Sequence, residues 1–244
     1  MKIQQTTTAA IILGLGIAIG GIMIGRGFQL GRSADRYVTV KGVAERDVTA
    51  DLAIWPLRVV AADNDLPTAH AKLQSSVQKI MQFLAAQHVD TSLATLTNFE
   101  VSDAFTNQYG GADRAVNRYV IHQTVVIRSS NPAQVLAASQ RVAELVNSGV
   151  VLSSGGEYGG GGPNFVFTGL NKLKPAMIAD ATARAREAAE QFARDSKSAI
   201  GGIMTANQGI FEILPRDQAQ GITQESQVEK TVRVVSTVNY YLKD

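Results

Sequence analysis

The sequence predicts an α+β protein, in which antiparallel sheets have helices packed on one face and a hydrophobic helix precedes them. Segments with an apolar residue at every second position, typical of half-buried strands, occur mostly in adjacent pairs along the chain. Segments with apolar residues every three or four positions, typical of amphipathic helices, separate these pairs. The resulting order, ββ-α-ββ-α-β-α-ββ, is one of hairpins alternating with helices, which predicts the α+β class.

The N-terminal stretch 9–25 contains seventeen residues and no charge. A membrane-spanning helix needs about 20 apolar residues, with about 17 as the lower limit, so we expect this stretch to anchor the chain in a membrane. A cleaved signal peptide stays open as an alternative, because Lys2 supplies a positive start and Ala18-Ile19-Gly20 supplies small residues before a cut. The five glycines of the stretch disfavour a buried core helix.

Two pairs of glycines in this stretch, Gly16 with Gly20 and Gly21 with Gly25, are each four residues apart. This spacing puts small residues on one helix face, where two membrane helices can approach closely. The four glycines are therefore a predicted self-association site. Three arginines follow the stretch and one lysine precedes it, so the positive-inside rule favours a cytoplasmic body and argues against export.

We expect residues 1–30 to be the anchor or signal peptide, residues 31–36 a linker and residues 37–244 the folded body. A body of about 210 residues buries roughly 70% of the surface of its unfolded chain, so it needs no disulfide or metal for stability. The absence of cysteine from the sequence excludes disulfides and thiolate metal sites. The 23 Lys and Arg residues nearly balance the 21 Asp and Glu residues, so we predict no nucleic-acid partner.

The body begins with two predicted strands, 37–48 and 52–60. Gly42 indicates a bend or bulge in the first, and Pro56 places the second at an edge or a bulge, because proline donates no hydrogen bond to a neighbouring strand. A helix follows from about residue 67 to residue 88, with Asp65 as its N-cap. Its predicted inward residues are Ala69, Leu73, Val77, Ile80 and Leu84.

A predicted hairpin comes next, with strands 95–106 and 118–128 joined by the polar loop 107–117. A second helix then starts at Asn131-Pro132 and ends at Gly149. Its predicted inward residues are Val135, Val142 and Val146.

The last part of the body contains a short strand, 165–167, and the longest predicted helix, 171–197. Two strands, 203–214 and 228–242, complete the body. The predicted inward residues of the long helix are Ala181, Ala185, Ala188 and Phe192, and its predicted surface ion pairs are Asp180–Arg184 and Glu190–Arg194.

The sequence contains no recognisable catalytic motif. The glycine cluster 155–162 lacks the lysine and hydroxyl residues of a phosphate-binding loop, and a strand rather than a helix follows it. The histidines His70, His88 and His122 have no metal-ligand partner three or four residues away. We therefore predict no catalytic residue, no cofactor-binding residue, no cofactor and no metal site.

Four segments of the body have the order and spacing of a known family. They are residues 38–59 (VTVKGVAERDVTADLAIWPLRV), 119–128 (YVIHQTVVIR), the alanine-rich 179–203 and 230–242 (KTVRVVSTVNYYL). Through them the chain resembles the SIMPL-domain family, which includes bacterial envelope proteins and an immunogenic periplasmic antigen. The turn 196–199 differs from the glycine-containing turn usual in the family, and this affects the expected geometry of the turn.

The resemblance implies a SIMPL-like α+β fold, a body outside the cytoplasm, ring-like or channel-like oligomers in some members, and a link to envelope stress tolerance. It supplies no catalytic residue. We therefore expect a non-enzymatic homo-oligomer that acts by self-assembly or partner binding at the cell envelope. Residues 9–25 would hold it in the inner membrane with the body facing the periplasm, or the body would be periplasmic after cleavage.

Exposed strand edges at 37–48 or 228–242 are the expected assembly surfaces. The alternative is a small-ligand-binding protein, or an enzyme of unknown type, with a cleft near the loop Gly155–Gly162. A deep pocket lined by converging polar groups would favour this alternative, whereas open sheet edges would favour assembly.

Overall fold

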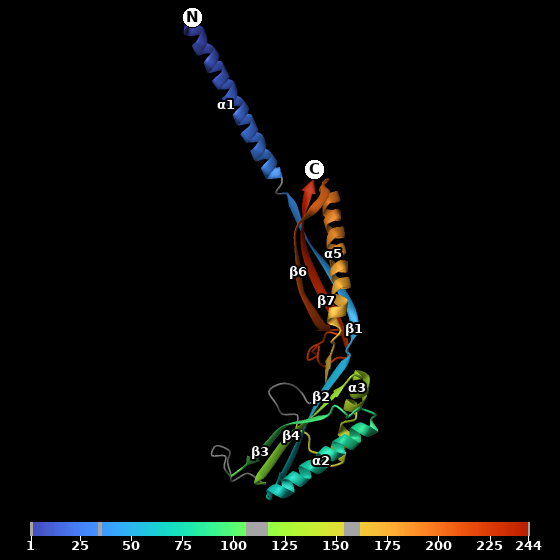
Figure 1. The fold of residues 1–244 in the computed structure, drawn as a ribbon. Helices are drawn as coiled ribbons and strands as arrows, with labels where there is room; N and C mark the ends of the chain where they lie inside the picture. Colours follow the sequence, from blue (N-terminus) through green and yellow to red (C-terminus); the bar gives the residue numbers. More distant parts are fainter. Residues whose placement is uncertain (1, 34–35, 106–116, 154–161, 244) are drawn as a thin grey trace. The chain divides into compact units, whose positions relative to one another are not determined.

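The computed structural model describes residues 2–33, 36–105, 117–153 and 162–243, and in the first helix it describes the side chains of residues 13–28. The helices and strands follow the predicted order, with the second helix of the body divided in two (Figure 1). Their bounds are α1 Lys2–Ser33, β1 Tyr37–Thr49, β2 Leu52–Asp63, α2 Leu66–Ala86, β3 Thr95–Asp103, β4 Tyr119–Ser129, α3 Pro132–Gln140, α4 Ala143–Asn147, β5 Asn164–Val166, α5 Leu170–Asp195, β6 Ala199–Pro215 and β7 Glu229–Lys243. The predicted α+β class is confirmed.

The strands form two antiparallel sheets. The first has the order β1-β7-β6, and the second has the order β3-β4-β2-β5. The chain divides into two compact units: unit 1 contains residues 1–44, 175–211 and 234–244, and unit 2 contains residues 45–174 and 212–233. Strands β1, β6 and β7 therefore contribute residues to both units.

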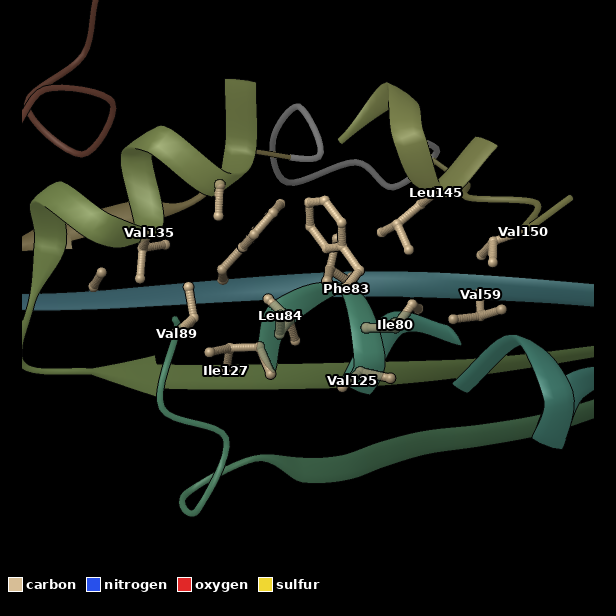
Figure 2. Packing of buried hydrophobic residues seen from close by; sticks show 14 of the residues in the cluster. Val59, Ile80, Phe83, Leu84, Val89, Val125, Ile127, Val135, Leu145 and Val150 are labelled. Atoms are coloured by element: carbon tan, nitrogen blue, oxygen red, sulfur yellow. The ribbon is translucent and has the colours of Figure 1, made fainter. Parts of the chain in front are cut away.

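Unit 2 has the larger hydrophobic core. Strand β2 pairs with β4 so that Trp55 lies opposite Ile127, and every second residue of β2 from Ala53 to Ala61 is buried. Helix α2 covers this face, and residues of α3 and α4 complete the cluster (Figure 2). The labelled side chains in Figure 2 are Val59, Ile80, Phe83, Leu84, Val89, Val125, Ile127, Val135, Leu145 and Val150.

Helix α2 begins as the sequence predicts. The Asp65 carboxylate accepts a hydrogen bond from the Thr68 N–H at 3.0 Å, which satisfies one of the free N–H groups of the first turn. The helix ends at Ala86, and His88 follows with a left-handed backbone at φ 59°. Four of the five predicted inward residues are buried, and the fifth, Val77, is half-buried against the core.

The predicted single helix of residues 131–149 is wrong. Helix α3 ends at Gln140, and Arg141 has ψ 9° and donates its N–H to the Ala138 carbonyl, three residues back. This tighter turn rotates the following residues about the helix axis. Leu145 of α4 is therefore buried, and the predicted inward Val146 is 58% exposed.

Pro56 lies where its missing N–H costs no hydrogen bond to a neighbouring strand. One side of β2 pairs with β4 from Ala53 to Asp63, with Pro56 opposite Val126. On the other side, β5 pairs with residues 52–54, and the described chain next pairs with β2 at Val59. The predicted edge position of Pro56 is thus confirmed locally.

Unit 1 contains α1, most of α5 and parts of β1, β6 and β7. Helix α5 buries every fourth residue, namely Met177, Ala181, Ala185, Ala189 and Ala193. The predicted inward Ala188 is half-buried against this core, whereas Phe192 is 58% exposed, so the prediction for Phe192 is wrong. Alanine at the inward positions lets the helix approach the sheet closely, whereas a buried phenylalanine would hold it away. Glu190 pairs with Arg186 at 3.2 Å instead of the predicted Arg194.

Strand β1 continues through Gly42, from Tyr37 to Thr49, and the bend or bulge at Gly42 stays a prediction. A Cβ atom at Gly42 would lie 2.6 Å from the Ala185 nitrogen and 2.9 Å from the Ala181 carbonyl carbon. The absence of a side chain therefore lets the α5 backbone contact the β1 backbone.

Helix α1 confirms that the N-terminal stretch is helical. Across the described residues, no helix is both long enough and apolar enough to cross a membrane. The role of residues 9–25 as a membrane anchor stays a prediction.

Candidate functional site

The sheet edges are the candidate interaction surfaces, because an unpaired edge presents backbone N–H and C=O groups to another strand. The sequence predicted edges at 37–48 and 228–242. The first is confirmed, because β1 lies at an edge of its sheet. The second is wrong, because β7 lies between β1 and β6 and alternates between buried and half-buried residues from Glu229 to Tyr240. Strand β6 occupies the second edge of that sheet.

In the part of the chain that the structure describes, three of the four sheet edges have features that discourage pairing. Strand β1 exposes a series of charged side chains, Lys41, Glu45, Arg46 and Asp47. Strand β3 is interrupted by a bulge between Thr97 and Glu100, where Asn98 has φ 51°. Strand β5 has three residues. Each of these edges therefore offers a short, charged or irregular surface.

The fourth edge, formed by residues 202–210 of β6 and called the β6 edge, is uncharged and belongs to a strand of 17 residues. Residues 199–211 of this strand contain no charge and no proline. Every residue from Gly202 to Ile210 is exposed, and Ile210 is 78% exposed. In the described chain, β6 pairs with β7 alone.

A groove of about 550 Å³ lies between α5 and β6 in unit 1. Ala179, Thr182 and Ala183 of α5 form one side, and Gly201, Gly202 and Ile203 of β6 form the other. Ala185 and Ala189 of α5 pack with Val40 of β1 and with Val238 and Tyr240 of β7, and the partly buried Ile200 of β6 packs against this cluster. Helix α5 thus covers β1 and β7 and leaves the β6 edge open.

A second groove of about 690 Å³ lies between α2 and β3 in unit 2. It is lined by His70 and Met81 of α2, by Leu96 and Phe99 of β3, and by Gln123 of β4, among others. The His70 and Phe99 rings meet edge to face, with their centroids 6.1 Å apart. The lining combines apolar, amide and imidazole groups.

The structure does not bring the three histidines together in one site. His70 lies in α2, His88 follows the end of α2, and His122 lies in β4 opposite Val60. Where the chain is described, no group of three or more His, Cys, Asp or Glu residues could hold a metal ion.

The predicted glycine sites lie partly outside the described residues. The loop Gly155–Gly162 is described at Gly162 alone, so the predicted cleft near it is not described. Gly16, Gly20, Gly21 and Gly25 lie in α1, and a Cβ atom at any of them would have no atom within 4 Å. Their self-association stays a prediction.

Lys230 is a buried charged residue that the sequence analysis missed. It is 1% exposed, and its Nζ donates a hydrogen bond to the Gln224 carbonyl oxygen. Burial lowers the pKa of Lys230, and the nearby Glu225 carboxylate partly opposes this shift. The sequence contained a signal of this burial. Lys230 lies two residues before Val232 and four before Val234, so it shares the inward face of the strand with them.

Lys230→Met is expected to remove a pH dependence of stability. Because the pKa of Lys230 is lower in the folded chain, the unfolded chain binds more protons than the folded chain between that pKa and the ordinary lysine value of 10.5. The wild type is therefore expected to gain stability relative to Lys230→Met as the pH rises from 7 to 10, measured by urea unfolding. If the wild type and Lys230→Met differ in free energy of unfolding by the same amount at every pH, this prediction is contradicted. Lys243→Met, at an exposed lysine of the same strand, serves as the control.

The comparisons with known proteins add one match. A family profile described as SIMPL, protein of unknown function (DUF541), matches residues 38–240. A search of curated proteins gave no match.

Proposed function

The chain belongs to the SIMPL family, and from this membership we propose that it is a non-enzymatic protein of the cell envelope that acts through self-assembly or partner binding. Residues 9–25 hold it in the inner membrane with the body facing the periplasm, or the body is periplasmic after cleavage. A contribution to envelope stress tolerance is part of this proposal.

The β6 edge is the observation that carries the proposal. It is a long, uncharged and exposed edge strand. Natural proteins usually protect such an edge from pairing, so an unprotected edge indicates that another strand covers it. Addition of a strand to an open sheet edge is a common mode of protein recognition. A function through protein contacts accounts for the features of this edge.

The proposal is tested by measuring the mass of the full chain in mild detergent by light scattering over a range of concentrations. The expected result is a protein mass above the 26.0 kDa of one chain, increasing with concentration. A chain that stays monomeric at every concentration would contradict self-assembly. Detergent micelles without protein give the baseline for the mass.

The proposed location is tested by cell fractionation and by sequencing the N-terminus of the protein. An intact Met1 in the membrane fraction, with the body open to protease added from the periplasmic side, supports the anchor. A mature chain that starts near Gly21 supports cleavage. A body protected from this protease would mean that the arginines after residue 25 determine the orientation and that the proposed location is wrong.

The groove between α2 and β3 favours a second candidate function, the binding of a small apolar ligand. Leu96 and Phe99 are more than half exposed, and they would be covered by a ligand that fills the groove. Ligand-induced stabilisation of the wild type, lost in Phe99→Ala, would support this function.

A further inference from the structure

The β6 edge has a sequence that complements itself when it is read in reverse. Residues 201–211 read GGIMTANQGIF, with large apolar residues and glycines at mirrored positions about Ala206. If two such strands pair antiparallel with Ala206 opposite Ala206, Ile203 lies opposite Gly209 and Ile210 lies opposite Gly202. Phe211 then lies opposite Gly201.

From this pattern we propose that β6 pairs antiparallel with β6 of a second copy of the chain, about a twofold axis at Ala206. The inference rests on the proposed self-assembly and names its surface and its partner. The two three-stranded sheets would join into one six-stranded sheet, and both open β6 edges would be paired. This is an isologous contact, because each copy contributes the same residues.

Two observations support the axis at Ala206. Ala206 is the midpoint of the exposed segment 202–210, so this register pairs the whole segment with its copy. In this register each exposed isoleucine covers a glycine of the other strand, which has no side chain of its own to shield the backbone. Opposite residues also have the same parity, so their side chains lie on one face, as antiparallel pairing requires.

The charge pattern favours a second copy as the partner. Like charges directly opposite each other destabilise a strand pair, and residues 199–211 contain no charge that would meet its own copy. Self-pairing of β1 would bring several charged side chains close to their copies. Anchoring of all copies on one membrane would also raise their effective concentration.

The absence of cysteine makes the register measurable, since one introduced cysteine is the only thiol of the chain. A disulfide needs Cα atoms within about 7 Å of each other. Directly opposite residues of antiparallel strands are about 4.5–5.5 Å apart, which meets this limit. Ala206→Cys in the full chain is therefore expected to form a disulfide-linked dimer on mild oxidation, seen in non-reducing gels.

Neighbouring positions provide the matched controls. Met204 lies two residues from the axis, so two copies of Met204→Cys would be separated by about four residues, or about 13 Å along the strand. Met204→Cys alone and Gln208→Cys alone are expected to stay unlinked, and the two variants mixed are expected to link, because Met204 lies opposite Gln208. Thr39→Cys, an exposed position on the other edge of the same sheet, is expected to stay unlinked.

A charge at the axis tests the same contact without a disulfide. Ala206→Lys places two ammonium groups opposite each other, and it is expected to lose the assembled species in light scattering at concentrations where the wild type assembles. Ala206 is exposed, so a circular dichroism spectrum like that of the wild type is expected for this variant.

The outcomes separate this inference from the proposed function. Linkage at Ala206→Cys, together with linkage of Met204→Cys to Gln208→Cys in the mixture, supports the inference. A wild type that assembles while Ala206→Cys stays unlinked, or while Thr39→Cys links in its place, overturns the inference and leaves the proposed function standing. A wild type that is monomeric throughout overturns this inference together with the self-assembly on which it rests, and leaves partner binding as the proposed function.

Discussion

Gly42→Ala is expected to lower the free energy of unfolding of unit 1 by about 3 kcal/mol, the upper part of the range for an overpacked core. The added methyl group would meet backbone atoms of Ala181 and Ala185, which cannot rotate away as a side chain can. Helix α5 would have to move from the sheet, and the contacts of its buried alanines with Val40, Val238 and Tyr240 would weaken.

Hydrogen exchange of the α5 backbone amides measures this effect within unit 1. The amides of residues 177–193 are expected to exchange faster in Gly42→Ala than in the wild type, because exchange protection follows local stability. Gly162→Ala is the control, since a methyl group there meets no atom of the described residues within 4 Å. Unchanged protection of α5 in Gly42→Ala would contradict the close approach of the two backbones.

Local signals predicted most of the secondary structure. The start of α2 depends on Asp65 and Pro67, which lie within the first turn, and Gly149 has the positive φ of 89° that suits a glycine at the end of a helix. These features depend on residues close in sequence. The break at Arg141 also arises locally, but no glycine or proline marks it, so apolar spacing alone placed Val146 on the wrong face.

The arrangement of strands depends on contacts between residues far apart in sequence, and the sequence analysis missed part of it. Alternation in β7 shows that one face is buried, and it has the same form in a central strand and in an edge strand. The prediction therefore placed an edge at 228–242. The role of Gly42 was missed for the same reason, because the residues that approach it, Ala181 and Ala185, are about 140 positions away along the chain.

The candidate surface was predictable in kind but not in position. The sequence predicted that open sheet edges would be the assembly surfaces, and the uncharged run 199–211 was visible in it. An uncharged strand, however, is also typical of a fully buried central strand. Only the order β1-β7-β6 shows that this run lies at an edge and is exposed.

Trp55→Ala is expected to cost about 3–5 kcal/mol in the free energy of unfolding of unit 2, the range for removing a large aromatic side chain from a core. Trp55 is 1% exposed and lies opposite Ile127 in the paired strands β2 and β4. Since small domains are stable by only about 5–15 kcal/mol, this loss would leave unit 2 close to unfolding at room temperature. Urea unfolding followed by far-ultraviolet circular dichroism measures the loss, because the variant removes the single tryptophan.

Trp55→Phe separates the loss of volume from the loss of the indole N–H. Among the described residues, Trp55 Nε1 is buried and has no hydrogen-bond partner. A buried N–H without a partner costs about 1–3 kcal/mol, so its removal offsets part of the cavity that the smaller ring leaves. The loss in Trp55→Phe is therefore expected to be less than half of that in Trp55→Ala. Equal losses in the two variants would mean that the indole N–H is hydrogen-bonded in the folded protein and stabilises the core.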